Sequence, residues 1–133
     1  MRVEGGGRPL VLLLTPGQWH EQTVFDALPA GGAVRRPGRG RPRQRPDRLV
    51  GDRGYSSRHV RRVLRARGIA VAIPYRRTER HRRAVDPAVY HERNRFERCI
   101  NRLKQFRRVA TRYEKLAANF LAMATLAAIM LWL

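Results

Sequence analysis

Two short apolar runs separated by a helical pattern constrain the fold of this chain more than any other feature. The runs are Leu49–Val50 and Ile69–Tyr75, and the segment 57–68 between them places its apolar residues on one helix face. We expect the serines at 56–57 to cap this helix and Gly68 to end it. A strand, a helix and a second strand with short connections are typical of a crossover unit in a mainly parallel sheet. The sequence therefore predicts an α/β fold.

The remainder of the chain divides into four further segments. Leu10–Leu14 reads as a buried strand between two prolines, and 20–30 as a short helix. The segment 34–48 is rich in Arg, Pro and Gly and is predicted to be a flexible basic loop, because it has almost no apolar surface to bury. A long helix is predicted over 87–106. The total of 133 residues suits one domain.

The last eighteen residues, Leu116–Leu133, contain no charge. This length reaches the lower limit for a membrane span, so a membrane helix is one interpretation. Asn119, Thr125 and six alanines lower its hydrophobicity, which favours the alternative of a buried core helix. We therefore expect an apolar C-terminal helix that packs in the core and no membrane association.

The charge of the chain points to a polyanionic partner. The formal net charge is +19, from 29 basic and 10 acidic residues, and all the basic residues except Lys104 and Lys115 are arginines. Arginine presents a planar fork of donors that suits phosphate oxygens. Nucleic acid is the first expected partner and an anionic membrane surface the second. The single cysteine, Cys99, excludes an internal disulfide and indicates a small helix residue in a reducing cytoplasm.

The predicted long helix carries a line of polar side chains beside its apolar stripe. At 100° per residue, Tyr90, Arg93, Glu97 and Lys104 fall within an arc of roughly 60°. The neighbouring apolar stripe consists of Val89, Phe96, Ile100 and Leu103. A simple amphipathic helix with an Arg93–Glu97 ion pair explains the same pattern. A functional interpretation therefore needs a second group.

Asp52 is that second group. It directly follows Leu49–Val50, at the carboxyl end of a strand, where open α/β sheets place their sites. An Asp-x-Gly turn is the ordinary structural explanation of this residue. Together with Glu97, however, Asp52 could supply oxygen ligands to Mg²⁺, and paired Mg²⁺ ions support phosphodiester cleavage and transfer. That chemistry normally needs a third carboxylate.

The spacing of Tyr90, Arg93, Glu97 and Lys104 resembles the "YREK" signature of DDE transposases from bacterial insertion sequences. The segment "GDRGY" around Asp52 is similar to the part that carries their second catalytic aspartate. The segment "GRPLVLLLTPGQWHEQTVFDAL" resembles their third core strand and following helix, and the last 33 residues resemble their usual C-terminus. The resemblance covers nearly the whole chain.

This resemblance implies a fold, a site and partners. The fold would be ribonuclease-H-like, with a mixed sheet flanked by helices and an apolar C-terminal helix. Asp52 and Glu97 would be catalytic residues and Mg²⁺ ligands, while Tyr90, Arg93 and Lys104 would position DNA. The implied activity is strand cleavage and transfer at insertion-sequence ends by a cytoplasmic, nucleoid-associated protein that forms a homo-oligomer when complete.

The chain also departs from the family pattern. The first catalytic aspartate would lie on a strand upstream of the apolar run, where residues 1–8 offer only Glu4, outside any predicted strand. The sequence thus resembles the C-terminal part of a transposase, without the first core strand and the N-terminal DNA-binding region. Activity would require the half encoded upstream. The alternatives are a non-catalytic basic DNA-binding remnant and, more distantly, a small membrane-anchored protein.

Overall fold

A computed structural model of the protein describes residues 1–19, 25–35, 38–80 and 83–133. The chain forms two compact units. The first unit combines Met1–Gln18 with Asn94–Leu133, and the second comprises Trp19–Arg93. Both contain short strands and helices, so the predicted α/β composition is confirmed.

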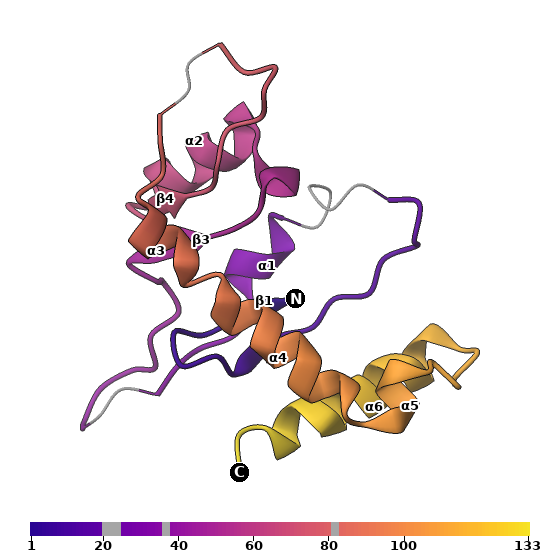
Figure 1. The fold of residues 1–133 in the computed structure, drawn as a ribbon. Helices are drawn as coiled ribbons and strands as arrows, with labels where there is room; N and C mark the ends of the chain where they lie inside the picture. The colour runs from indigo at the N-terminus through magenta and orange to yellow at the C-terminus, as the bar shows by residue number, and fades with distance from the viewer. Residues whose placement is uncertain (20–24, 36–37, 81–82) are drawn as a thin grey trace. The chain divides into compact units, whose positions relative to one another are not determined.

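The predicted strand–helix–strand crossover forms the centre of the second unit. Strands β3 (Arg48–Val50) and β4 (Ala70–Ala72) are parallel, with Leu49 opposite Val71. Helix α2 (Arg58–Ala66) connects them and packs against β4 (Figure 1). The other helical elements described in this unit are α1 (Ala27–Ala30), the 3₁₀ turn η2 (Arg53–Tyr55) and α3 (Pro87–His91).

Local hydrogen bonds define both ends of α2 as the sequence predicted. The Ser57 hydroxyl accepts the N–H of Val60 at 3.1 Å and caps the N-terminus. At the other end Gly68 has a φ of +64°, a left-handed conformation that glycine adopts without a Cβ clash. The N–H of Gly68 donates to the Arg65 carbonyl and the N–H of Ile69 to the Leu64 carbonyl, which is the Schellman pattern of helix termination.

Replacing Ser57 with Ala is expected to lower the free energy of unfolding by about 1 kcal/mol, because the N-terminal amides of α2 lose their side-chain acceptor. Chemical denaturation followed by circular dichroism measures the change. Ser57→Thr is the matched control, because threonine keeps the hydroxyl. An alanine variant as stable as the threonine variant would show that the cap contributes nothing.

The core of the second unit lies between α2 and the crossover strands. Its buried members are Val60 and Leu64 of α2, Phe25 before α1, and Ile69 and Ile73 on either side of β4. Val60 and Leu64 occupy adjacent turns of α2, which is the face that the apolar spacing predicted. Tyr55 packs against this cluster, and its ring lies 6.3 Å from that of Phe25. Tyr55, which borders this core, is only three positions after Asp52 in the sequence.

The first unit joins an N-terminal hairpin to three helices. Strands β1 (Arg2–Val3) and β2 (Pro9–Val11) are antiparallel. Helix α4 (Asn94–Lys104) packs against β1 and against the helices α5 (Arg107–Ala110) and α6 (Ala117–Met130), as Figure 1 shows. The strand expected at Leu10–Leu14 is shorter than predicted: β2 ends at Val11, and Leu13 and Leu14 are exposed.

The C-terminal helix is only partly buried, which corrects the expectation of a core helix. The side of α6 that carries Ala124, Ala127 and Ala128 is buried, and the last two pack against Cys99 and Leu103 of α4. The exposed large apolar residues of the C-terminal segment are Leu116, Leu126, Ile129, Met130, Trp132 and Leu133. Small alanines permit close helix packing, whereas Leu126, Ile129 and Met130 of α6 are not covered within this unit. Among the described helices, none is long and apolar enough to cross a membrane.

A single mixed sheet does not form among the described residues. The strands divide into two separate two-stranded sheets, one in each unit. The run at Leu10–Leu14 contributes to β2, which pairs with β1, whereas Leu49–Val50 belongs to β3, which pairs with β4. Apolar composition predicts a strand without identifying its partner, so the sequence alone did not predict the pairing of β2 with β1.

The predicted long helix is interrupted. Helix α3 begins at Pro87 as expected, but it ends at His91, and α4 begins at Asn94. The N–H groups of Glu92 and Arg93 donate to carbonyls three residues earlier, those of Val89 and Tyr90, which is a tighter turn than an α-helix. The single helical wheel drawn through 87–106 therefore does not apply across this turn.

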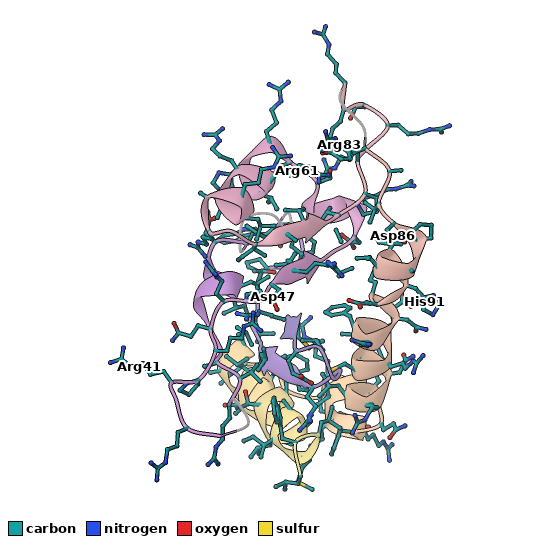
Figure 2. The ribbon with its side chains drawn as sticks, turned by 90° about the vertical axis from the view of Figure 1, so that its left-hand side faces the viewer. Arg41, Asp47, Arg61, Arg83, Asp86 and His91 are labelled. Atoms are coloured by element: carbon teal, nitrogen blue, oxygen red, sulfur yellow. The ribbon has the colours of Figure 1, made fainter. Side chains whose placement is uncertain are left out.

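Two other predicted segments are described only in part. Residues 20–24 of the predicted helix 20–30 lie outside the described residues, and the described part contains α1, Ala27–Ala30. In the basic segment 34–48, Val34 and Arg43 form a β-bridge, and Arg43 forms an ion pair with Asp47. Figure 2 shows Arg41 of this segment extending away from the ribbon.

Candidate active site

Asp52 lies in a turn directly after strand β3. Its Oδ1 atom accepts the N–H of Gly54 at 2.8 Å, and its carbonyl accepts the N–H of Tyr55 at 3.2 Å. These bonds form the Asx turn that the Asp-x-Gly sequence predicted, and they use one of the two carboxylate oxygens. The side chain is partly buried. The turn therefore fixes the aspartate near the surface of the second unit.

The position of this turn in the crossover unit suits a functional site. Because β3 and β4 are parallel, both end at the same edge of their sheet, and the N–H of Gly51 donates to Ala72 at that edge. Loops that follow adjacent parallel strands are the common location of sites in α/β folds. The segment after β4 begins at Ile73, which contacts the Gly51 position closely. Asp52 thus lies where two strand-end loops meet.

Tyr90 and Arg93 belong to the same unit as Asp52. Tyr90 is in α3, whose N-terminus is capped by Asp86 through a 2.9 Å bond from the Ala88 N–H. Arg93 follows α3, and its guanidinium lies 5.6 Å from the centre of the Tyr90 ring. Both side chains are partly buried. The structure therefore brings these two members of the predicted signature together.

Glu97 and Lys104 lie on α4 in the first unit. They are seven residues apart, so they occupy the same side of this helix, and both are exposed. The buried side of α4 is centred on Cys99 and Leu103, whereas Phe96 of the predicted apolar stripe is 37% exposed. Burial raises the pKa of the Cys99 thiol, although the charge of Arg102 opposes this effect. Cys99 is thus a buried residue of α4, in agreement with its interpretation as a small helix residue.

The position of Glu4 corrects the expectation that this residue lies away from any strand. It directly follows β1, so it does have a strand context, and its Oε1 atom accepts the Arg8 N–H at 3.0 Å. The same oxygen lies 3.6 Å from the Arg8 Nε atom. Glu4 therefore closes the turn of the β1–β2 hairpin, which is a structural role.

The described residues do not by themselves fit a two-metal site. Asp52 belongs to the second unit and Glu97 to the first. Within the described ranges, no group of three His, Cys, Asp or Glu side chains is placed to hold a metal ion. Two-metal phosphoryl transfer needs ligands that bridge and flank both ions, so a further acidic residue is required.

Comparison with known proteins decides the family. The sequence pattern of the transposase DDE domain matches residues 49–133, which include Asp52 and all four residues of the predicted signature. The chain belongs to the DDE transposase family. The resemblance identified from the sequence is thereby confirmed.

Two relatives of this DDE transposase chain are transposases assigned to insertion sequences. The chain is 36% identical over 118 residues to that of element IS402 from Burkholderia cepacia, a match that covers 86% of this chain and 52% of the relative. It is 30% identical over 132 residues to that of element IS6501 from Brucella ovis, covering 98% of this chain and 93% of the relative. The chain thus spans about half the length of the first relative. No solved structure matches the chain.

Arg61 is a residue of this transposase chain that the sequence interpretation missed. It lies on α2 and is only 7% exposed, and Figure 2 shows it among the residues of this helix. Its guanidinium stacks on the Tyr75 ring at 3.6 Å and donates to the Ile73 carbonyl at 3.0 Å. Arg61 follows Val60 and precedes Leu64 by three residues, so the helical wheel places it beside the buried face. Because the helix segment 57–68 contains several other arginines, its sequence did not single out Arg61 as a buried residue.

Proposed function

We propose that this chain is the C-terminal catalytic portion of an insertion-sequence transposase that cleaves and joins DNA at the ends of the element. The single observation that carries the proposal is the match to the transposase DDE domain over residues 49–133, which contain Asp52 and the spacing Tyr90, Arg93, Glu97 and Lys104. In this proposal Asp52 and Glu97 are the second and third acidic residues of the triad. The other three side chains position the DNA strand.

The proposed activity requires a further acidic residue from another part of the transposase. We call the chain joined to a transposase segment that provides this residue the complemented transposase. Mg²⁺ is the proposed cofactor of this form, because carboxylate oxygens are its preferred ligands in proteins. The proposal also includes the ribonuclease-H-like fold, homo-oligomer formation and a cytoplasmic location on the nucleoid.

A cross-linking experiment tests whether Asp52 and Glu97 share one site. In a Cys99→Ala background, Asp52→Cys and Glu97→Cys are combined, and a short bifunctional thiol reagent is added to the complemented transposase with DNA. We expect an intramolecular cross-link, because two side chains that bind the same pair of metal ions must lie close together.

The control pair is Asp52→Cys with Arg98→Cys. Arg98 is also exposed on α4, but it is rotated by about 100° from Glu97. Equal cross-linking of both pairs, or none of the 52–97 pair, would contradict a shared site.

A second candidate function is a DNA-binding remnant without catalysis. The specific observation in its favour is that no three potential metal ligands gather within the described part of the chain. This function predicts DNA binding by the chain and no cleavage by the complemented transposase. Cleavage assays on element-end DNA therefore separate the two functions.

A further inference from the structure

The loop after β4 holds the turn that contains Asp52 through a set of polar contacts outside the predicted signature. The side chains involved are Arg76 and Glu79 of this loop and Arg61 of α2, and we call these three the clasp. All three belong to the second unit, as does Asp52. None of them belongs to the YREK signature or to the predicted acidic triad.

Arg76 contacts the backbone of the turn directly. Its Nε atom donates to the Arg53 carbonyl at 3.1 Å, and one terminal nitrogen donates to the Gly54 carbonyl at 2.8 Å. Gly54 also donates its N–H to the Asp52 carboxylate at 2.8 Å. The carboxylate and the Arg76 guanidinium therefore hold opposite sides of the same glycine.

Glu79 connects Arg76 to the rest of the clasp. Its Oε1 atom accepts the backbone N–H of Arg76 at 2.8 Å and also accepts the Ser56 hydroxyl. Burial raises the pKa of Glu79, but the hydrogen bonds from Ser56 and Arg76 and the charges of Arg61 and Arg76 outweigh burial, so the pKa is lowered overall. Glu79 is thus held as a carboxylate at neutral pH, which is the form that accepts these bonds.

Arg61 completes the clasp from inside the unit. Its terminal nitrogen donates to the Ser56 hydroxyl at 2.8 Å, and its Nε atom lies 4.0 Å from the Glu79 Oε2 atom. A buried guanidinium is stable only when charged and polar partners compensate for lost water. Here those partners are residues of the two loops that meet beside Asp52. Burial of Arg61 therefore depends on the loops being in this arrangement.

We propose that the clasp residues Arg61, Arg76 and Glu79 are positioning residues that hold the Asp52 carboxylate in its reactive orientation. The inference rests on the proposed catalytic role of Asp52. The apolar core of the unit consists of other residues, namely Phe25, Val60, Leu64, Ile69 and Ile73. Removing Arg76 should therefore loosen the turn and leave the core folded.

The test compares Arg76→Gln with Arg77→Gln, which removes the same charge from the adjacent exposed position. In the 133-residue chain, amide hydrogen exchange at Gly54 is measured together with global unfolding. We expect about tenfold faster exchange at Gly54 in the Arg76 variant with an unchanged unfolding midpoint, because only the local opening of the turn becomes easier. The Arg77 variant should exchange like the unmodified chain.

The same variants are then assayed in the complemented transposase. Arg76→Gln is expected to lower the turnover number by about 10–100-fold with DNA affinity unchanged, and Arg76→Lys should restore part of the loss. If Asp52→Asn abolishes cleavage but Arg76→Gln behaves like Arg77→Gln in both measurements, the positioning role alone is overturned. Cleavage that survives Asp52→Asn would overturn the proposed function itself, and the positioning role with it.

Discussion

We expect no cleavage of insertion-sequence-end DNA by the isolated 133-residue chain in the presence of Mg²⁺ or Mn²⁺. Asp52 and Glu97 are only two carboxylates, and Glu4 is engaged in its hairpin turn with Arg8. The two remaining aspartates upstream of Asp52 offer no convincing third ligand. Asp47 forms an ion pair with Arg43, and the Asp26 carboxylate lies 3.1 Å from the His59 ring. Gel assays on labelled DNA measure this result.

Cleavage should appear in the complemented transposase, and Asp52→Asn or Glu97→Gln should return it to background. These substitutions keep the shape of the side chain and remove the charge that a divalent cation requires. Glu92→Gln is the matched control for Glu97→Gln, because Glu92 is another exposed glutamate, located in the turn between α3 and α4. Robust cutting by the isolated chain would show that the triad is misplaced, and a fully active Glu97→Gln variant would exclude that residue from it.

DNA binding by the chain should weaken steeply as salt increases. Arginine–phosphate contacts release condensed counterions, so a protein with 6–10 such contacts loses about 10³–10⁵ in affinity between 50 and 200 mM salt. The net charge of +19 and the many exposed arginines make contacts on this scale accessible. Fluorescence anisotropy with duplex DNA at several salt concentrations measures the slope. We also expect little sequence preference, because phosphate contacts carry no sequence information directly.

Helix α2 offers a defined variant for this experiment. Arg58, Arg62 and Arg65 are exposed and follow one side of the helix at intervals of four and three residues. Replacing all three with Gln should reduce the salt slope by about 3 if each contacts one phosphate. The triple Lys variant keeps the charge and should keep the slope. An affinity that does not change with salt would contradict electrostatic binding altogether.

Local features of the structure could be predicted from the sequence because neighbouring residues encode them. The cap at Ser57, the stop at Gly68 and the apolar face of α2 each depend on side chains within one or two helical turns. The Asx turn at Asp52 has the same origin. The family signature was equally readable, because it consists of residue types at fixed spacing, and the match to the transposase DDE domain confirms the family.

Tertiary structure alone decided which elements meet and what they bury. Strand β3 pairs with β4 and not with the first apolar run, because partner choice depends on distant parts of the chain. Arg61 is buried because Tyr75, Ser56 and Glu79 surround it, although most arginines of the chain lie at the surface. Leu126, Ile129 and Met130 of α6 remain exposed for the converse reason, since no element of the first unit covers them, whereas Ala127 and Ala128 pack against α4. Helical and strand periodicity report what a segment can bury, and only the packed chain determines whether a neighbour is there to bury it.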